Sequence, residues 1–273
     1  MAEFLVTFRE TLEAALIVGI LYTYLVKSER MDLAPRLWNG VGVAVVASLV
    51  VALLFQNLAG GFSGRREEIF EGVVMILAAG VLSTMIIWMA RNRNISRDLE
   101  VKAQSALASD SRAGIGLFLL AFVAVFREGV ETVLFLYGVM SNQGGLSFAA
   151  SLAGGLTAVA IGYAIFVQGK RLPLKTFFNV SSILLILFAA GLVAHGIHEF
   201  HEADLLPFGQ PIWDVNPALR PDGTYPMFHD KGTLGALAKG LFGWNGDPSL
   251  PEVLAWLLSV SGIGWLWRRA TLQ

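Results

Sequence analysis

Two charged motifs with the same spacing lie inside hydrophobic stretches of this chain. They are Arg9–Glu13, with sequence R-E-T-L-E, and Arg127–Glu131, with sequence R-E-G-V-E. At the centre of a membrane helix each such charge costs roughly 2.5 to 3.5 kcal/mol, so the six together cost on the order of 15 to 20 kcal/mol before pairing. Because ionisable residues inside a membrane usually mark ion or substrate pathways, we interpret the motifs as a cation path. The structural alternative is an Arg/Glu latch that joins two helices.

Within each motif the Arg and the second Glu are four residues apart, and the two Glu are three apart. On a helix this spacing places all three side chains on about one face. The candidate metal ligands are therefore Glu10, Glu13, Glu128 and Glu131, with Arg9 and Arg127 as charge-balancing partners. An arriving cation would compete with the guanidinium groups for the carboxylate oxygens. Both arginines are then expected to move aside.

The composition restricts the class of protein. Of 273 residues, 55% are hydrophobic and only 15% are charged, which indicates a polytopic membrane protein. The basic residues are scattered rather than striped, so a nucleic-acid partner is not expected. There is no Cys, so a metal must be held by oxygen or imidazole. The N-terminus lacks a basic n-region and is interpreted as a retained helix.

Seven hydrophobic runs approach the length of a membrane span. They cover about 4 to 26, 37 to 58, 69 to 90, 115 to 140, 146 to 168, 176 to 200 and 250 to 267. Lysines and arginines concentrate in the linkers after the first, third and fifth runs and in the C-terminal tail. The positive-inside rule then predicts an N-terminus outside and a C-terminus in the cytoplasm. We expect a single transmembrane domain over residues 1–273.

The runs predict an internal repeat. The first and fourth carry the R-E-x-x-E motif, and the third and sixth share Ala-Ala-Gly at 78–80 and 189–191, small residues suited to close helix packing. Three spans per unit invert the second copy, which gives a 3+3 inverted repeat with a site near the midplane and a seventh helix outside it. In this arrangement Glu13 and Glu128 share one depth and Glu10 and Glu131 another.

Two further clusters are predicted at the outer ends of the third and sixth runs. The third run begins with the acids Glu67, Glu68 and Glu71. The sixth run ends with imidazoles and acids: His195, His198, Glu199, His201, Glu202 and Asp204. Each cluster alone could be an ordinary solvated helix end. Their common location favours metal capture, with carboxylate and imidazole as ligands. The histidine spacing does not match the metalloprotease motif H-E-x-x-H.

The linker 201–249 is expected to be an ordered external excursion because it is rich in proline. Within it, residues 233–244 place several apolar side chains on one helical face. This pattern predicts an interfacial helix on the outer leaflet, and a loop packed on the bundle is the alternative.

These motifs together resemble the oxidase-dependent iron permeases, in particular the bacterial Efe-type ferrous iron uptake family. The resemblance includes both R-E-x-x-E helices, E-E-x-x-E from Glu67, H-G-I-H-E-F-H-E-A from His195 and G-L-F-G-W from Gly240. Thr11 stands where the family usually has Gly, and Val130 where it usually has Leu. The iron-pathway roles in that family fall on Glu10, Glu13, Glu128 and Glu131, with Arg9 and Arg127 as companions and Glu67, Glu68 and Glu71 as the outer site.

The resemblance implies seven helices in the bacterial inner membrane and iron that crosses as Fe3+ after a partner oxidises Fe2+. The partners implied are a periplasmic iron-binding protein and a haem peroxidase or other ferroxidase. Iron is the transported substrate, and no permanently bound cofactor is expected. Carboxylates also accept other hard cations, so a Pb2+ permease is one alternative. A membrane iron receptor that binds without transport is another. An intramembrane enzyme is disfavoured because no nucleophile and base pair is evident.

Overall fold

Helices make up the regular structure of this protein. The computed structural model describes residues 2–91, 101–105, 113–143, 145–166, 174–207, 210–216 and 225–272. The elements are α1 (Ala2–Lys27), the 3-10 turn η1 (Met31–Leu33), α2 (Ala34–Ala59), α3 (Arg65–Arg91), α5 (Ala113–Gln143), α6 (Phe148–Phe166), α7 (Leu174–Glu202), α8 (Thr233–Phe242) and α9 (Leu250–Leu272). The all-α prediction is confirmed for this part of the chain.

In the part of the chain that the structure describes, six helices are long and apolar enough to cross a membrane: α2, α3, α5, α6, α7 and α9. The chain is therefore a multi-pass membrane protein. Helix α1 has 26 residues, which at 1.5 Å per residue is about 39 Å and exceeds a hydrocarbon layer of about 30 Å. Its charged motif lowers its apolar character, but Arg9, Glu10 and Glu13 are all buried. The count of seven spans stays a prediction that depends on α1.

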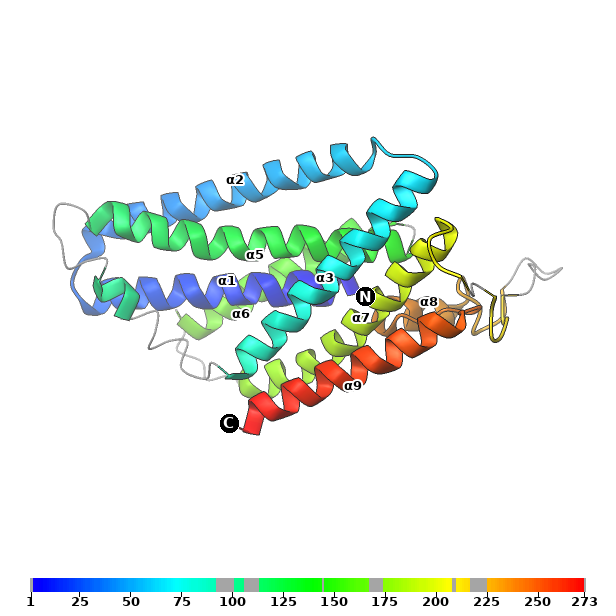
Figure 1. Cartoon of the computed structure of the whole chain (residues 1–273). Helices are drawn as coiled ribbons and strands as arrows, with labels where there is room; N and C mark the ends of the chain where they lie inside the picture. Colours follow the sequence, from blue (N-terminus) through cyan, green and yellow to red (C-terminus); the bar gives the residue numbers. More distant parts are fainter. Residues whose placement is uncertain are drawn as a thin grey trace.

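Successive long helices run in opposite directions and form two groups (Figure 1). In one group α1, α2, α5 and α6 lie side by side, and in the other α3 packs on α7 and both contact α9. Helices α1, α3 and α9 end at the same side of the bundle, with Lys27, Arg91 and Arg269 in their last turns. This clustering is what the positive-inside prediction requires. The basic linker residues within 92–100, 106–112 and 167–173 lie outside the described residues.

The packing within the first group is reciprocal. Helix α1 packs along α6, α2 packs along α5, and the two motif-bearing helices α1 and α5 contact each other. The first helix of each proposed half therefore lies against the second helix of the other half. An inverted repeat produces this exchange, and it does not follow from a simple chain of neighbouring hairpins. The repeat itself remains a prediction.

The third residue of each motif fits a small partner on the facing helix. Thr11 of α1 faces Gly155 of α6, with its Oγ1 3.7 Å from the position of an added Cβ on that glycine. On α5 the sizes are reversed, because Gly129 faces Ser48 of α2 and an added Cβ would overlap the Ser48 hydroxyl. Gly155 therefore leaves room for the Thr11 side chain.

We expect Gly129→Ala to lower the stability of the protein by about 1–3 kcal/mol through overpacking against Ser48. Gly155→Ala is the matched control, since its Cβ would make only ordinary contact with Thr11. Thermal unfolding in detergent measures both. Ser48→Gly should restore part of the stability of Gly129→Ala, and equal unfolding midpoints for the two alanine variants would contradict this packing argument.

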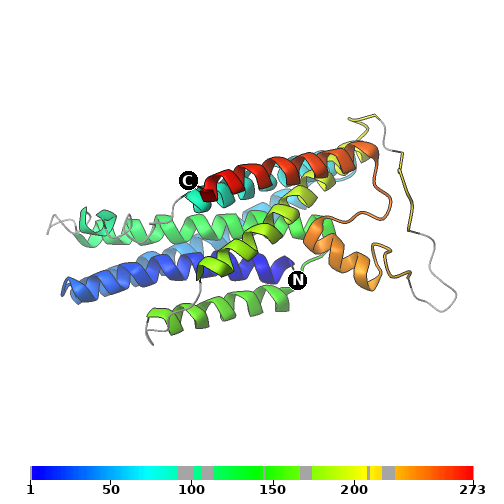
Figure 2. The ribbon, with the colours of Figure 1, turned by 90° about the horizontal axis from the view of Figure 1, so that it is seen from below.

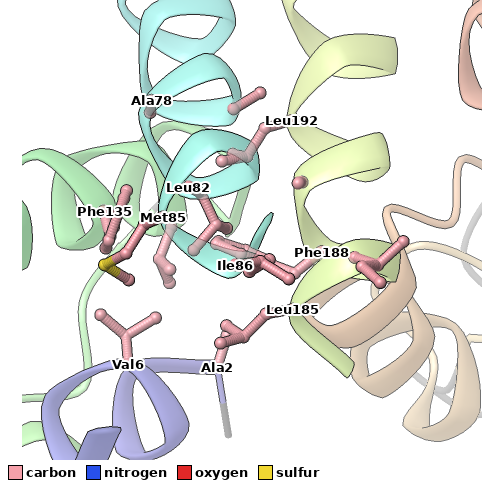
Figure 3. Packing of buried hydrophobic residues seen from close by; sticks show 14 of the residues in the cluster. Ala2, Val6, Ala78, Leu82, Met85, Ile86, Phe135, Leu185, Phe188 and Leu192 are labelled. Carbon is pink, nitrogen blue, oxygen red and sulfur yellow. The ribbon is translucent and has the colours of Figure 1, made fainter. Parts of the chain in front are cut away.

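The main apolar core lies where α3 crosses α7 (Figure 3). Leu82 and Ile86 of α3 face Leu185 and Phe188 of α7 there, whereas Met85 points toward Phe135 and Val6. The alanine pairs at 78–79 and 189–190 are fully or almost fully buried, as the small-residue pattern predicts. Phe135 of α5 and Ala2 and Val6 of α1 complete the cluster. This core fixes α3 beside both motif-bearing helices.

The outer surface of α2 is apolar. Val46, Leu49, Leu53 and Leu54 are each at least 60% exposed. A continuous apolar face of this kind suits contact with lipid rather than water.

Helix α8 lies at the end of the bundle where α7 ends and α9 begins (Figure 2). It packs on α7, and Gly243 at its left-handed C-cap (φ 71°) approaches Gly191 closely enough that neither could carry a Cβ without overlap. Leu234 and Leu237 remain 45% and 46% exposed. The helix predicted within 233–244 is present and packs on the bundle, so the alternative of a loop is wrong, and the position of this helix on the outer leaflet stays a prediction. Parts of the predicted excursion 201–249, at 208–209 and 217–224, lie outside the described residues.

Candidate metal site

Three carboxylates from the two motifs come together inside the bundle. One oxygen each from Glu10 of α1 and from Glu128 and Glu131 of α5 lies within 4.8 Å of the other two. In the part of the chain that the structure describes, this is the one group of three or more potential metal ligands at such distances. Its members come from both proposed halves of the repeat.

Each arginine bonds the two glutamates of its own motif. Arg9 Nη1 lies 3.2 Å from Glu10 Oε1, and Arg9 Nη2 lies 3.1 Å from Glu13 Oε1. Arg127 Nη2 lies 2.9 Å from Glu128 Oε1, and Arg127 Nε lies 3.2 Å from Glu131 Oε1. The predicted helical face is therefore the face on which these ion pairs form.

The chemistry of the three carboxylates suits a hard cation. Glu10 Oε2 and Glu131 Oε2 are buried and make no hydrogen bond within the described residues, and the buried Glu128 carboxylate is paired through Oε1 with Arg127. Buried polar atoms without partners are rare and indicate a ligand or water. Two oxygens that bind one ion with bonds of about 2.0–2.2 Å lie at most about 4.4 Å apart. Small side-chain rotations would bring a 4.8 Å group within that limit.

Glu13 is placed differently from the other three carboxylates. It is not a member of the close group, although its charge interacts with those of Arg127 and Glu128. Glu128 interacts with both Glu10 and Glu13 across the contact of α1 with α5. The four carboxylates thus form one electrostatic cluster, of which three are close enough to share an ion.

The predicted outer clusters meet at one end of the bundle. Glu71 of α3 interacts electrostatically with Glu67 and Glu202, and Glu199 of α7 interacts with Glu68, Glu71 and Glu202. Arg65 at the start of α3 donates a hydrogen bond from Nε to the carbonyl of Ala203 at 2.9 Å, which joins the two helix ends. Tyr137 and Ser141 of α5 also lie beside Glu71.

The histidines of this region turn toward α9. His198 Nδ1 lies 3.2 Å from Glu252 Oε1, and its Nε2 lies 3.3 Å from Glu202 Oε1. His201 Nε2 lies 3.0 Å from the Pro207 carbonyl, and its Nδ1 is 3.5 Å from Ser249 Oγ. His195 is buried and packs near His198. The partners of His198 are thus Glu202 at the end of α7 and Glu252 on α9, and those of His201 are Pro207 after α7 and Ser249 just before α9, while the acids of α3 group around Glu199.

Sequence reasoning did not identify Glu252. Its buried carboxylate accepts hydrogen bonds from Ser249 N at 3.2 Å, Ser249 Oγ at 2.8 Å and Asn245 Nδ2 at 2.8 Å. Ser249 and Glu252 have the S-x-x-E spacing of a helix capping box, and this spacing could have revealed the residue. Oε1 of the same carboxylate also contacts His198 Nδ1, and this contact joins the start of α9 to the end of α7.

We expect Glu252→Gln to destabilise the protein by about 1–3 kcal/mol because it weakens several hydrogen bonds to one buried charge. Glu202→Gln is the control, since Glu202 contacts the same histidine but its side chain is 56% exposed. Unfolding midpoints in detergent compare the two variants. A larger loss from Glu202→Gln would show that the α9 junction does not depend on Glu252.

Three further residues near the site were not predicted, and all are on α3. Met85 Sδ and Met89 Sδ lie 3.8 Å and 3.0 Å from the terminal nitrogens of Arg9. The Trp88 ring centroid lies 5.5 Å from Cζ of Arg127. An apolar run contains no signal that would distinguish these positions from ordinary core or lipid-facing residues.

A multi-pass helical bundle with a buried cluster of carboxylates and arginines defines an α-helical membrane protein with an ionisable interior site. The chain matches the model described as the Iron permease FTR1 family over residues 1–267. It is 35% identical over 258 residues to the ferrous iron permease EfeU of Escherichia coli O6:H1, covering 93% of this chain and 90% of that protein. It is 33% identical to the ferrous iron permease EfeU of Yersinia pestis, covering 93% and 88%. No solved structure shows a significant match.

The chain therefore belongs to the iron permease FTR1 family. The family and both relatives are permeases, so the protein is a membrane transporter and not an enzyme. The resemblance drawn from the paired R-E-x-x-E helices is confirmed.

Proposed function

We propose that this protein imports iron across the bacterial cytoplasmic membrane through the site formed by Glu10, Glu128 and Glu131. The observation that carries the proposal is the approach of one oxygen from each of these carboxylates, two of them buried and that of Glu131 partly buried, to within 4.8 Å of one another. They lie in the interior of a bundle of membrane-spanning helices. The names of the relatives, both called ferrous iron permeases, support iron as the substrate.

The charge balance supports a cation as the transported species. With all six groups of the motifs ionised, four carboxylates and two guanidinium groups give a net charge of −2. The site then attracts positive charge, and the arginines reduce the repulsion among the carboxylates before an ion arrives. A trivalent iron ion is hard and suits an all-carboxylate set. We therefore propose that iron supplied as Fe2+ is oxidised by a partner and crosses as Fe3+.

The membrane arrangement proposed has seven spans, with α1 as the first. The charges of α1 face the bundle: Arg9 and Glu10 are 1% exposed and Glu13 is 7% exposed, so α1 can cross without placing them in lipid. The basic last turns of α1, α3 and α9 then lie in the cytoplasm. The acids at the α3 and α7 ends face outward, where they would collect iron delivered by a periplasmic iron-binding protein and a haem peroxidase or other ferroxidase.

Uptake into proteoliposomes that contain only this protein tests the proposal. Radioactive iron is supplied either as Fe2+ kept reduced or as Fe3+ citrate, and Pb2+ is supplied in a third arm. We expect accumulation of Fe3+ that exceeds that of Pb2+. Accumulation of Fe2+ alone would contradict oxidation before transport. Uptake of Pb2+ in preference to iron would support the heavy-metal alternative, and saturable binding without accumulation would support an iron receptor.

A further inference from the structure

The two arginines of the repeated motif occupy unequal surroundings. The Arg9 side chain is 1% exposed, and it is enclosed by Glu10, Glu13 and the sulfur atoms of Met85 and Met89. The Arg127 side chain is 47% exposed. It lines an open groove of about 320 Å³ together with Glu131 and four residues of α3: Val81, Thr84, Met85 and Trp88. One guanidinium group is fixed among neighbours, and the other has room beside it.

The two arginines also differ in how many of their carboxylate partners belong to the close group that would bind an ion. Both partners of Arg127, Glu128 and Glu131, belong to the group of three carboxylates. Only one partner of Arg9, Glu10, belongs to it, and Glu13 does not. An ion bound by the three carboxylates would therefore compete for both carboxylates of Arg127. It would leave Arg9 with Glu13.

Arg127 displaced in this way lies at membrane depth, where lipid offers no partner for its charge. The indole of Trp88 lies 5.5 Å from its Cζ and borders the same groove. An aromatic face attracts a guanidinium group, and the attraction is stronger where water is excluded. The groove supplies the volume for a small movement of the side chain from the carboxylates toward the ring.

We propose that Trp88 is a positioning residue that holds Arg127 when iron takes its carboxylates, and that Arg127 is the arginine that moves while Arg9 stays fixed. This inference rests on the proposed iron site. It changes the expectation from the sequence that both arginines move aside. The repeat then has one fixed counter-charge on α1 and one exchangeable counter-charge on α5, and α3 contacts both.

Equilibrium binding of radioactive Fe3+ citrate to the full-length protein in detergent tests the proposal without requiring transport. Trp88→Leu removes the aromatic face, and the bound state loses more than the empty state because only the bound state contains an unpaired Arg127. The iron concentration for half-saturation should rise about five- to thirty-fold, which corresponds to about 1–2 kcal/mol. Trp88→Phe retains a weaker aromatic face and should fall between the parent and Trp88→Leu. Trp38→Leu on α2, where the tryptophan is 54% exposed, is the matched control and should bind like the parent.

A double-mutant cycle separates this role from a general structural one. If Trp88 acts through Arg127, then Trp88→Leu should have no further effect on half-saturation in an Arg127→Met background. The same shift in that background, or no shift in the parent background, would overturn the proposal. The iron site is tested separately by Glu128→Gln. Normal iron binding by Glu128→Gln would refute the site itself. Loss of iron binding by Glu128→Gln, with unchanged half-saturation in Trp88→Leu, would refute only the role of Trp88.

Discussion

Glu128→Gln should reduce iron uptake into proteoliposomes about 100-fold or more. Replacing even an outer partner of a metal ligand typically costs 10- to 100-fold in affinity or activity, and Glu128 is proposed as a ligand itself. Glu128 is 2% exposed, and its carboxylate contacts Arg127 and belongs to the close group of three. Gln preserves the shape and removes the charge that an ion needs. The measurement is the initial rate of uptake at several iron concentrations, with the amount of reconstituted protein determined in parallel.

Three comparisons make the result for Glu128→Gln specific. Glu10→Gln and Glu131→Gln should fall in the same range, because their oxygens belong to the same close group. Glu13→Gln should lose less transport, since Glu13 is outside that group. Asp32→Asn in the turn η1, whose side chain is 63% exposed, should transport like the parent. Near-normal uptake by Glu128→Gln would refute the carboxylate site. Equal losses in all four Glu variants would refute the distinction between the three proposed ligands and Glu13.

The sequence predicted well those features that depend on local periodicity and hydropathy. The hydrophobic runs correspond to helices because a span of about 20 apolar residues has no other way to satisfy its backbone in lipid. The spacing of Arg9, Glu10 and Glu13 placed them on one helical face, and the arginine contacts both glutamates. Ala78, Ala79 and Ala189 pack at the crossing of α3 and α7, and Ala190 is also buried. Each of these features follows from a pattern within one helix.

The features that the sequence did not predict are contacts between helices. Glu10 and Glu13 are equivalent in the motif, and only their distances to α5 separate the carboxylate that joins the close group from the one that does not. His198 finds Glu252, which is 54 residues away. The unequal exposure of Arg9 and Arg127 depends on how α3 lies against α1 and α5. A repeated motif predicts the same surroundings for Arg9 and Arg127. Helix α3 instead presents Met85 and Met89 to Arg9 and Trp88 to Arg127, so the two surroundings differ.

Arg9→Leu should destabilise the protein by about 3–5 kcal/mol, the cost of removing one partner from a buried ion pair. The change leaves Glu10 and Glu13 buried without their nearest positive charge. Arg127→Leu should cost less, because the Arg127 side chain is 47% exposed and its ion pairs are therefore partly solvated. Thermal unfolding in detergent and the yield of folded protein measure both variants. Equal unfolding midpoints would contradict the distinction between a fixed and an exchangeable arginine.

The role of Arg9 in stability can be separated from its role in transport. Replacing a whole buried ion pair with neutral groups of similar volume is often neutral or stabilising, in contrast to breaking it. The triple variant Arg9→Met, Glu10→Gln, Glu13→Gln should therefore recover most of the stability that Arg9→Leu loses, while uptake stays low because Glu10 no longer binds the ion. If the triple variant is as unstable as Arg9→Leu, the loss comes from packing against Met85 and Met89. If it transports iron at the parent rate, the charged motif of α1 is a helix latch, and the ion path must be formed by α5 alone.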